Sequence, residues 1–164
     1  MTSTITATFK TRQAAEDALL KLENEGFTEE QVGLIVSDET RGKTFNLEKG
    51  SKTDEGFAAG VTTGGLIGAA FGSIMAAGAL TIPGLNVVVS GVLVSGLAGL
   101  GTGAVAGGLV GGLVGMGIPE HEARLYEDEI MNGAILLAVK PEDSDQKDKA
   151  KDILRSVDAY NIAA

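Results

Sequence analysis

The chain has 164 residues, a formal net charge of −9, 24 glycines and no cysteine. This length fits one ordinary domain with an insertion, and the acidic balance argues against nucleic-acid binding and against simple electrostatic docking on anionic lipid. Without cysteine there is no disulfide and no thiol-bound metal, which suits the cytosol, and residues 1–4 lack the basic and apolar regions of a cleavable signal.

The first forty residues predict a strand, a helix and a second strand. Residues 2–9 alternate threonine with apolar side chains, which is the period of a half-buried strand. Thr11 can cap the next helix, and Gly26 can supply its left-handed C-terminal cap. The helix has an apolar stripe at Ala15, Ala18, Leu19 and Leu22. Residues 32–37 predict the second strand, whereas residues 38–55 are polar and turn-rich and predict a loop.

A long uncharged segment follows, because the chain contains no Asp, Glu, Lys, Arg or His from Gly56 to Pro119. Small residues recur there every fourth position, and residues four apart share one helix face, so the pattern predicts a groove for close helix packing. The residues between the glycines are apolar, unlike those of a flexible linker. We expect a glycine-zipper helix-packing interface at Gly56, Gly60, Gly64, Gly68, Gly72, Gly91, Ser95, Gly99, Gly103, Gly107, Gly111 and Gly115.

Pro83 and Gly84 suit the two central positions of a type II turn, so the segment predicts a helical hairpin over residues 56–118. Its two helices, residues 57–80 and 85–116, are each long enough to cross a bilayer. A dry, protein-only assembly is the alternative environment for such apolar helices. In a membrane, the uncharged tip would be translocated and both termini would be cytoplasmic.

The chain beyond the hairpin predicts a helix, a strand, a helix and a short strand. Pro119 suits a helix start, the helix runs to about Met131, and Asn132 and Gly133 end it. Residues 134–139 are nearly all apolar, as in a central strand. The last helix opens near Ser144, and residues 160–162 predict the closing strand.

Without the hairpin and its exit helix, the order is strand, helix, strand, strand, helix, strand. This is the order of a ferredoxin-like split βαβ domain, an α+β fold, which residues 1–55 and 119–164 build around the hairpin between strands 2 and 3. Residues 134–139 should lie between the first two strands. Either the helix 119–131 or a second copy of the domain covers the open sheet face.

Four parts of the chain form a recognisable set: residues 8–12 with 15–22, the tip at Ile82-Pro83-Gly84, the exit motif at 117–123 with Tyr126, and the strand at 133–139. With these motifs, nearly the whole chain resembles the bacterial low-temperature-induced or general-stress family of glycine-zipper proteins. The resemblance implies a stress-associated, membrane-linked protein of unknown biochemical activity, so no catalytic residue is carried over. The chain departs from the family in its very short tip, and residues 38–55 match none of its motifs.

No catalytic, cofactor-binding or metal site is expected. Residues 99–104 fit the loose dinucleotide pattern G-x-G-x-x-A, but the pattern lies inside a continuing glycine row rather than between a strand and a helix. His121, flanked by Glu120 and Glu122, is expected to be an exposed residue at a helix start, because adjacent helical residues point in different directions.

Two functional interpretations follow from these patterns. The first is a non-enzymatic membrane-integrated protein of the cytoplasmic membrane, which forms homo-oligomers through its glycine zippers and displays the α+β domain in the cytoplasm. Its partners are its own copies and the lipid bilayer, not nucleic acid. The second is a self-assembling structural protein, a shell, tube or filament, whose apolar hairpins form a lipid-free wall.

Overall fold

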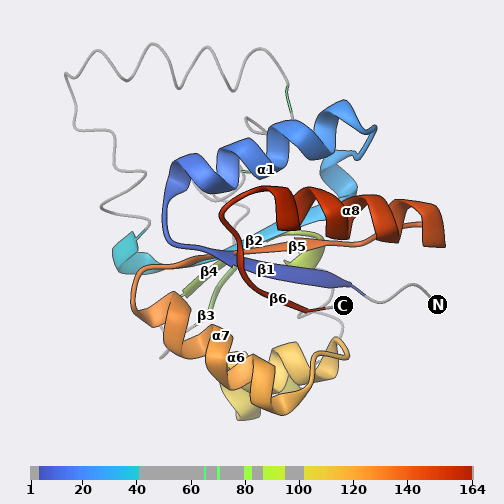
Figure 1. Cartoon of the computed structure of the whole chain (residues 1–164). Coiled ribbons are helices and arrows are strands. Elements are labelled where there is room, and N and C mark those ends of the chain that lie inside the picture. Colours follow the sequence, from blue (N-terminus) through green and yellow to red (C-terminus); the bar gives the residue numbers. More distant parts are fainter. Residues whose placement is uncertain are drawn as a thin grey trace.

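The computed structural model describes residues 4–40, 65, 70, 80–82, 87–94 and 102–163. Over these residues the chain is an α+β protein in three layers, a sheet between two pairs of helices (Figure 1). The elements are β1 (Ile5–Phe9), α1 (Arg12–Asn24), the short η1 (Glu29–Gln31), β2 (Val32–Ser37), β3 (Leu80–Ile82), β4 (Val87–Gly91), α6 (Thr102–Gly115), α7 (Glu120–Met131), β5 (Ile135–Val139), α8 (Ser144–Ser156) and β6 (Tyr160–Ala163).

Local capping interactions set the helix ends. Thr11 Oγ1 accepts a hydrogen bond from the backbone N–H of Ala14 at the start of α1, as predicted. The chain turns after α1, α6 and α7 through left-handed glycines, Gly26, Gly117 and Gly133, with φ of 90°, 92° and 101°. In each case the N–H of the glycine and the N–H of the next residue donate hydrogen bonds to carbonyl oxygens of the last helical turn. These carbonyl oxygens have no donor within the helix itself.

The sheet has six strands in the order β3-β4-β2-β5-β1-β6, and every neighbouring pair is antiparallel. The prediction that residues 134–139 form a central strand is confirmed, because β5 pairs with β1 on one side and β2 on the other. All five residues of β5 are buried. This position explains its continuous apolar sequence, since neither of its faces meets water.

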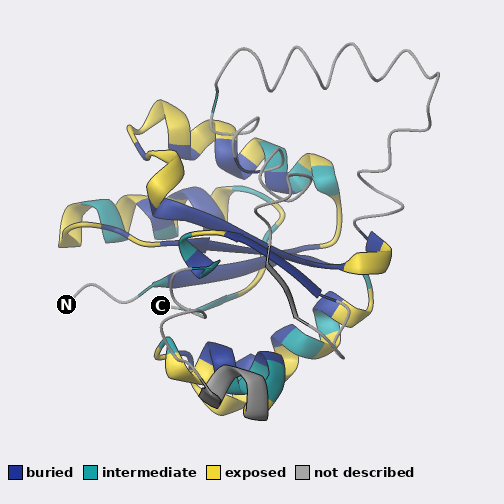
Figure 2. Cartoon of the chain, turned by 180° about the vertical axis from the view of Figure 1, so that it is seen from behind, coloured by how far each residue is buried: buried dark blue, intermediate teal, exposed yellow. Residues whose placement is uncertain are grey.

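The first face of the sheet lies under α1 and α8 (Figure 1). Its core contains side chains from β1, β2 and β5 together with Leu19 and Leu22 of α1 and Leu154 of α8. Ala70, from the glycine-rich segment, is also buried in this core. Figure 2 shows that burial is concentrated in the strands and in the helix surfaces turned toward them.

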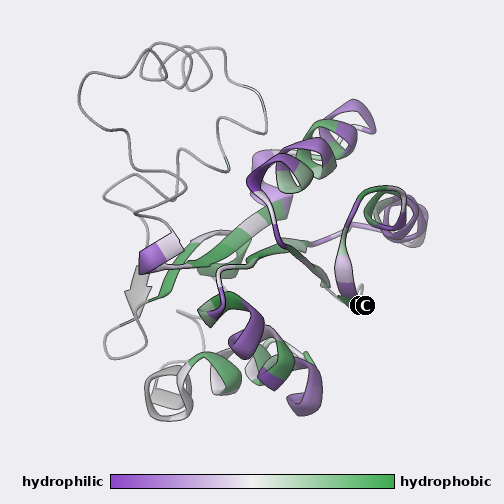
Figure 3. Ribbon diagram, turned by 60° about the vertical axis from the view of Figure 1, so that its left-hand side comes forward, coloured by the Kyte–Doolittle hydropathy of each residue, from purple (hydrophilic) through white to green (hydrophobic). Residues whose placement is uncertain are grey.

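The second face lies under α6 and α7. Leu109 and Leu113 of α6 pack with Tyr126 and Ile130 of α7 against strand residues that include Leu136. The sequence left open whether a helix or a second copy covers this face, and the structure places two helices of the same chain on it. Figure 3 shows the apolar strands between helices whose outward surfaces are largely hydrophilic on α1, α7 and α8.

The predicted helix over residues 85–116 is wrong at its beginning, because Val87–Gly91 is strand β4. Its residues Val87, Val88 and Val89 are β-branched, fully buried and paired with β2. Leu80, predicted to end the first helix, begins β3 instead, so the chain reverses between two antiparallel strands rather than two helices. Pro83 and Gly84, the predicted turn, lie outside the described residues.

Part of the uncharged segment belongs to the α+β domain and not to a separate helical hairpin. Residues 41–79 connect β2 and β3, which are strands of the same sheet. The later part of the segment is built into the domain as β3, β4 and α6. Among the helices that the structure describes, none combines the length and apolarity needed to cross a membrane.

Candidate functional site

The predicted glycine-zipper residues fall into three groups. One group lies outside the described residues: Gly56, Gly60, Gly64, Gly68, Gly72, Ser95 and Gly99. Gly91 lies in β4, so it belongs to a strand and not to a helix. Only the third group is helical, since Gly103, Gly107, Gly111 and Gly115 all lie in α6. The helix is broken at Gly108, whose φ is 64°, so the predicted four-residue row is interrupted between Gly107 and Gly111.

Gly91 is a point of close backbone approach within the sheet. Its φ is +67°, and it pairs across the strands with Gly33. A Cβ at position 91 would lie 2.2 Å from the carbonyl oxygen of Val32. The absence of a side chain is therefore required here by the contact between β2 and β4, and not by helix packing.

Two glycines of α6 are exposed on the side away from the sheet. Leu109 and Leu113 are buried against the second face, whereas Gly107 and Gly115 are exposed. A Cβ at Gly107 would meet no atom within 4 Å among the described residues. Val114 is 41% exposed on the same helix, and no residue of α6 is charged. The residues of α6 that reach the surface are therefore small and uncharged on both sides of the break at Gly108. We call this surface the α6 glycine face; it consists of Gly107, the half-buried Gly111, Val114 and Gly115.

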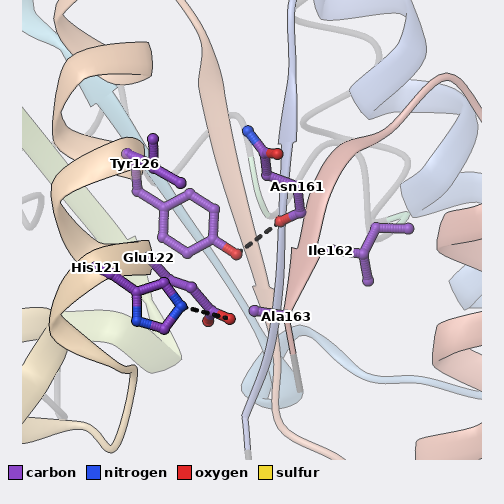
Figure 4. Close-up of a pocket in the computed structure, with 7 residues that line it drawn as sticks. His121, Glu122, Tyr126, Asn161, Ile162 and Ala163 are labelled. Atoms are coloured by element: carbon purple, nitrogen blue, oxygen red, sulfur yellow. Dashed lines mark hydrogen bonds and ion pairs between the residues drawn. The ribbon is translucent and has the colours of Figure 1, made fainter.

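A second feature is a polar network between α7 and β6. The Tyr126 side chain is buried, its hydroxyl accepts a hydrogen bond from Thr6 Oγ1 at 3.0 Å, and it donates one to the backbone oxygen of Asn161 at 2.7 Å (Figure 4). Burial raises the pKa of Tyr126 to about 12. The hydroxyl is therefore neutral near pH 7, and both of its hydrogen bonds hold β6 and β1 to α7.

Asn161 has an unusual backbone in the same network. Its φ is 46°, in the left-handed region, and the β1–β6 register shifts beside it, between Thr6 and Thr8. The side-chain Nδ2 of Asn161 donates a hydrogen bond to Glu129 Oε1 on α7. The irregular edge strand is therefore fixed to α7 by both the backbone and the side chain of one residue.

Two hollows flank this network. The first, of about 240 Å³, is lined by His121, Glu122, Leu125, Tyr126, Asn161, Ile162 and Ala163 (Figure 4). His121 is exposed, as predicted, and its Nε2 lies 3.8 Å from Glu122 Oε1. The second hollow, of about 270 Å³, is lined by Thr8, Lys10, Glu129, Asn132, Gly133, Ala134 and Tyr160. Within the described residues, no three potential metal ligands converge.

Sequence reasoning missed this network. It gave no role to the side chains of Glu129 and Asn161. The sequence does contain one signal for the burial of Tyr126, because Ala123, Tyr126 and Ile130 are spaced as a buried stripe on the helix α7. The partners of Tyr126 are 35 and 120 residues away in sequence, so only the fold brings them together.

Comparisons of the chain with protein-family models, curated proteins and solved structures find no match. The resemblance to the general-stress family therefore stays a prediction that rests on the motifs of the sequence.

Proposed function

We propose that the chain is a non-enzymatic, stress-associated protein that forms homo-oligomers through its glycine-rich helix surface, associates with a membrane, and displays a ferredoxin-like α+β domain. The observation that carries the proposal is the α6 glycine face. A surface helix of a soluble domain normally has a charged outer side, but α6 has none. Each glycine in a solvated helix also costs about 1 kcal/mol relative to alanine, so such a surface is favoured when another helix covers it.

The membrane part of the proposal rests on residues 56–79, which remain uncharged and outside the described elements apart from residues 65 and 70. Ala70 is buried in the core of the first face, so at this residue the segment is held by the domain and not by lipid. We therefore expect the uncharged segment to contact the surface of a membrane rather than to cross it.

A lipid-free assembly is the second candidate, because the uncharged α6 glycine face can pack against a second copy without lipid. Fractionation distinguishes the two candidates: pelleting that resists carbonate and is abolished by detergent supports the membrane protein, and lipid-free particles that resist detergent support the assembly.

The self-association itself is tested by Gly107→Leu. Because a Cβ at this position meets no atom within 4 Å, the substitution causes no clash within the described chain, and leucine is the better helix former. We expect the monomer to stay folded and the oligomer to dissociate, as measured by light scattering after gel filtration. Gln13→Leu, which adds the same side chain to an exposed position of α1, is the matched control.

Gly107→Ala should weaken the oligomer less than Gly107→Leu, because a methyl group separates the helices by less than an isobutyl group. An oligomer of unchanged size in Gly107→Leu contradicts the proposal that copies meet at the α6 glycine face.

A further inference from the structure

The second hollow lies where the end of β1, the end of α7 and the start of β6 meet. Lys10 follows β1, Glu129 belongs to the last turn of α7, and Tyr160 begins β6. Its volume of about 270 Å³ lies just below the roughly 300–1,000 Å³ of pockets for drug-sized ligands, so the hollow suits a smaller molecule. The hollow is lined by side chains of both charge signs, and this combination indicates what it can bind.

The acidic side of the hollow is Glu129. Its Oε1 accepts the hydrogen bond from Asn161, but its Oε2 is buried and has no partner among the described residues. A buried carboxylate oxygen without a donor is costly, and an ammonium group is a strong donor for it. Glu129 also lies near the C-terminus of α7, where the helix dipole favours positive charge. Both effects favour a cationic group beside Glu129.

The basic side of the hollow is Lys10. Its Nζ lies 4.2 Å from the centre of the Tyr160 ring, and no carboxylate in the described part of the chain forms an ion pair with it. Lys10 and Glu129 therefore line one hollow without neutralising each other. An ammonium group on Lys10 provides three donors for a carboxylate.

We propose that this hollow binds a small zwitterion of the size of an α-amino acid, with its ammonium group toward Glu129 and its carboxylate toward Lys10. A ligand with both charges satisfies both sides at once, whereas a simple amine or a simple acid satisfies one. The Tyr160 ring provides an apolar surface for a short side chain. This inference rests on the hollow alone and does not depend on the proposed oligomer or membrane contact.

The test is a titration of the full chain with glycine and L-alanine, followed by calorimetry and by amide NMR shifts. Methylammonium and acetate, titrated separately, serve as the two half-ligands. We expect saturable binding of the amino acids, at least about tenfold tighter than that of either half-ligand. The largest shifts should occur at Lys10, Glu129 and Tyr160.

Two variants test separately whether Glu129 and Lys10 contribute to binding. Glu129→Gln keeps the acceptor for Asn161 and removes the charge. Lys10→Met keeps an unbranched apolar side chain and removes the ammonium group that lies over the Tyr160 ring. Each should weaken amino-acid binding about tenfold or more, whereas Glu127→Gln on α7 and Lys151→Met on α8 should not change it. The dispersion of the NMR spectrum verifies that each variant is folded.

Three results would overturn the inference. The first is the absence of saturable binding by any amino acid tested. The second is equal affinity for an amino acid and for one of the half-ligands. The third is equal weakening by the control substitutions.

Discussion

The substitution Gly91→Ala distinguishes the observed strand from the predicted helix, because the change in the free energy of unfolding has opposite signs in the two cases. In the structure, Gly91 has a left-handed backbone, which costs an alanine about 1–2 kcal/mol. The new Cβ would also lie 2.2 Å from the Val32 oxygen and 2.8 Å from the Gly33 Cα, so β2 and β4 must separate. Both contacts are to backbone and cannot be relieved by a side-chain rotation. We expect a total loss of roughly 3 kcal/mol or more.

Had residue 91 been helical, the same substitution would have stabilised the chain by about 1 kcal/mol. For a chain of this length, 1 kcal/mol corresponds to about 2–4 °C in Tm, so the strand predicts a fall of roughly 6–12 °C and the helix a small rise. Thermal and urea unfolding of the full chain measure the difference. Gln13→Ala, at an exposed position of the helix α1, is the control and should change the stability by no more than about 0.5 kcal/mol. An unchanged or higher Tm for Gly91→Ala refutes the assignment of β4.

The remaining predictions concern the network between α7 and β6. Because the pKa of Tyr126 is raised to about 12, the stability that its neutral hydroxyl contributes is complete below pH 10 and is lost as the pH rises through about 12. Tyr126→Phe should remove this part of the pH dependence in urea unfolding, and it should cost about 1–2 kcal/mol at pH 7 because Thr6 loses its acceptor. Asn161→Ala should destabilise the chain more than Asn161→Gly, because alanine retains the strain of the left-handed backbone, where φ is 46°. Equal losses of Tm in the two Asn161 variants would contradict that reasoning.

The sequence by itself determined the elements whose ends depend on local contacts. The start of α1 depends on Thr11 and Ala14, which are three residues apart, and its end depends on the left-handed Gly26. The buried stripe of α1 and the apolar sequence of β5 likewise identify the surfaces that must leave water. These interactions act within a few residues, so they can be recognised from the sequence before any tertiary contact is known.

Only the tertiary structure decided the conformation of the glycine-rich segment and the makeup of the candidate site. A segment that is apolar on every side has no helical or strand period to distinguish the two, so Val87–Gly91 became a strand because the open edge of β2 could pair with it. In the same fold, Leu109 and Leu113 of α6 pack on the second face, whereas Gly107 and Gly115 are exposed. The site unites Thr6, Tyr126, Glu129 and Asn161, which have no fixed spacing in the sequence. Their proximity follows from the pairing of β1 with β6 and from the position of α7 beneath both strands, because hydrogen bonds between distant residues form only after the sheet has brought them together.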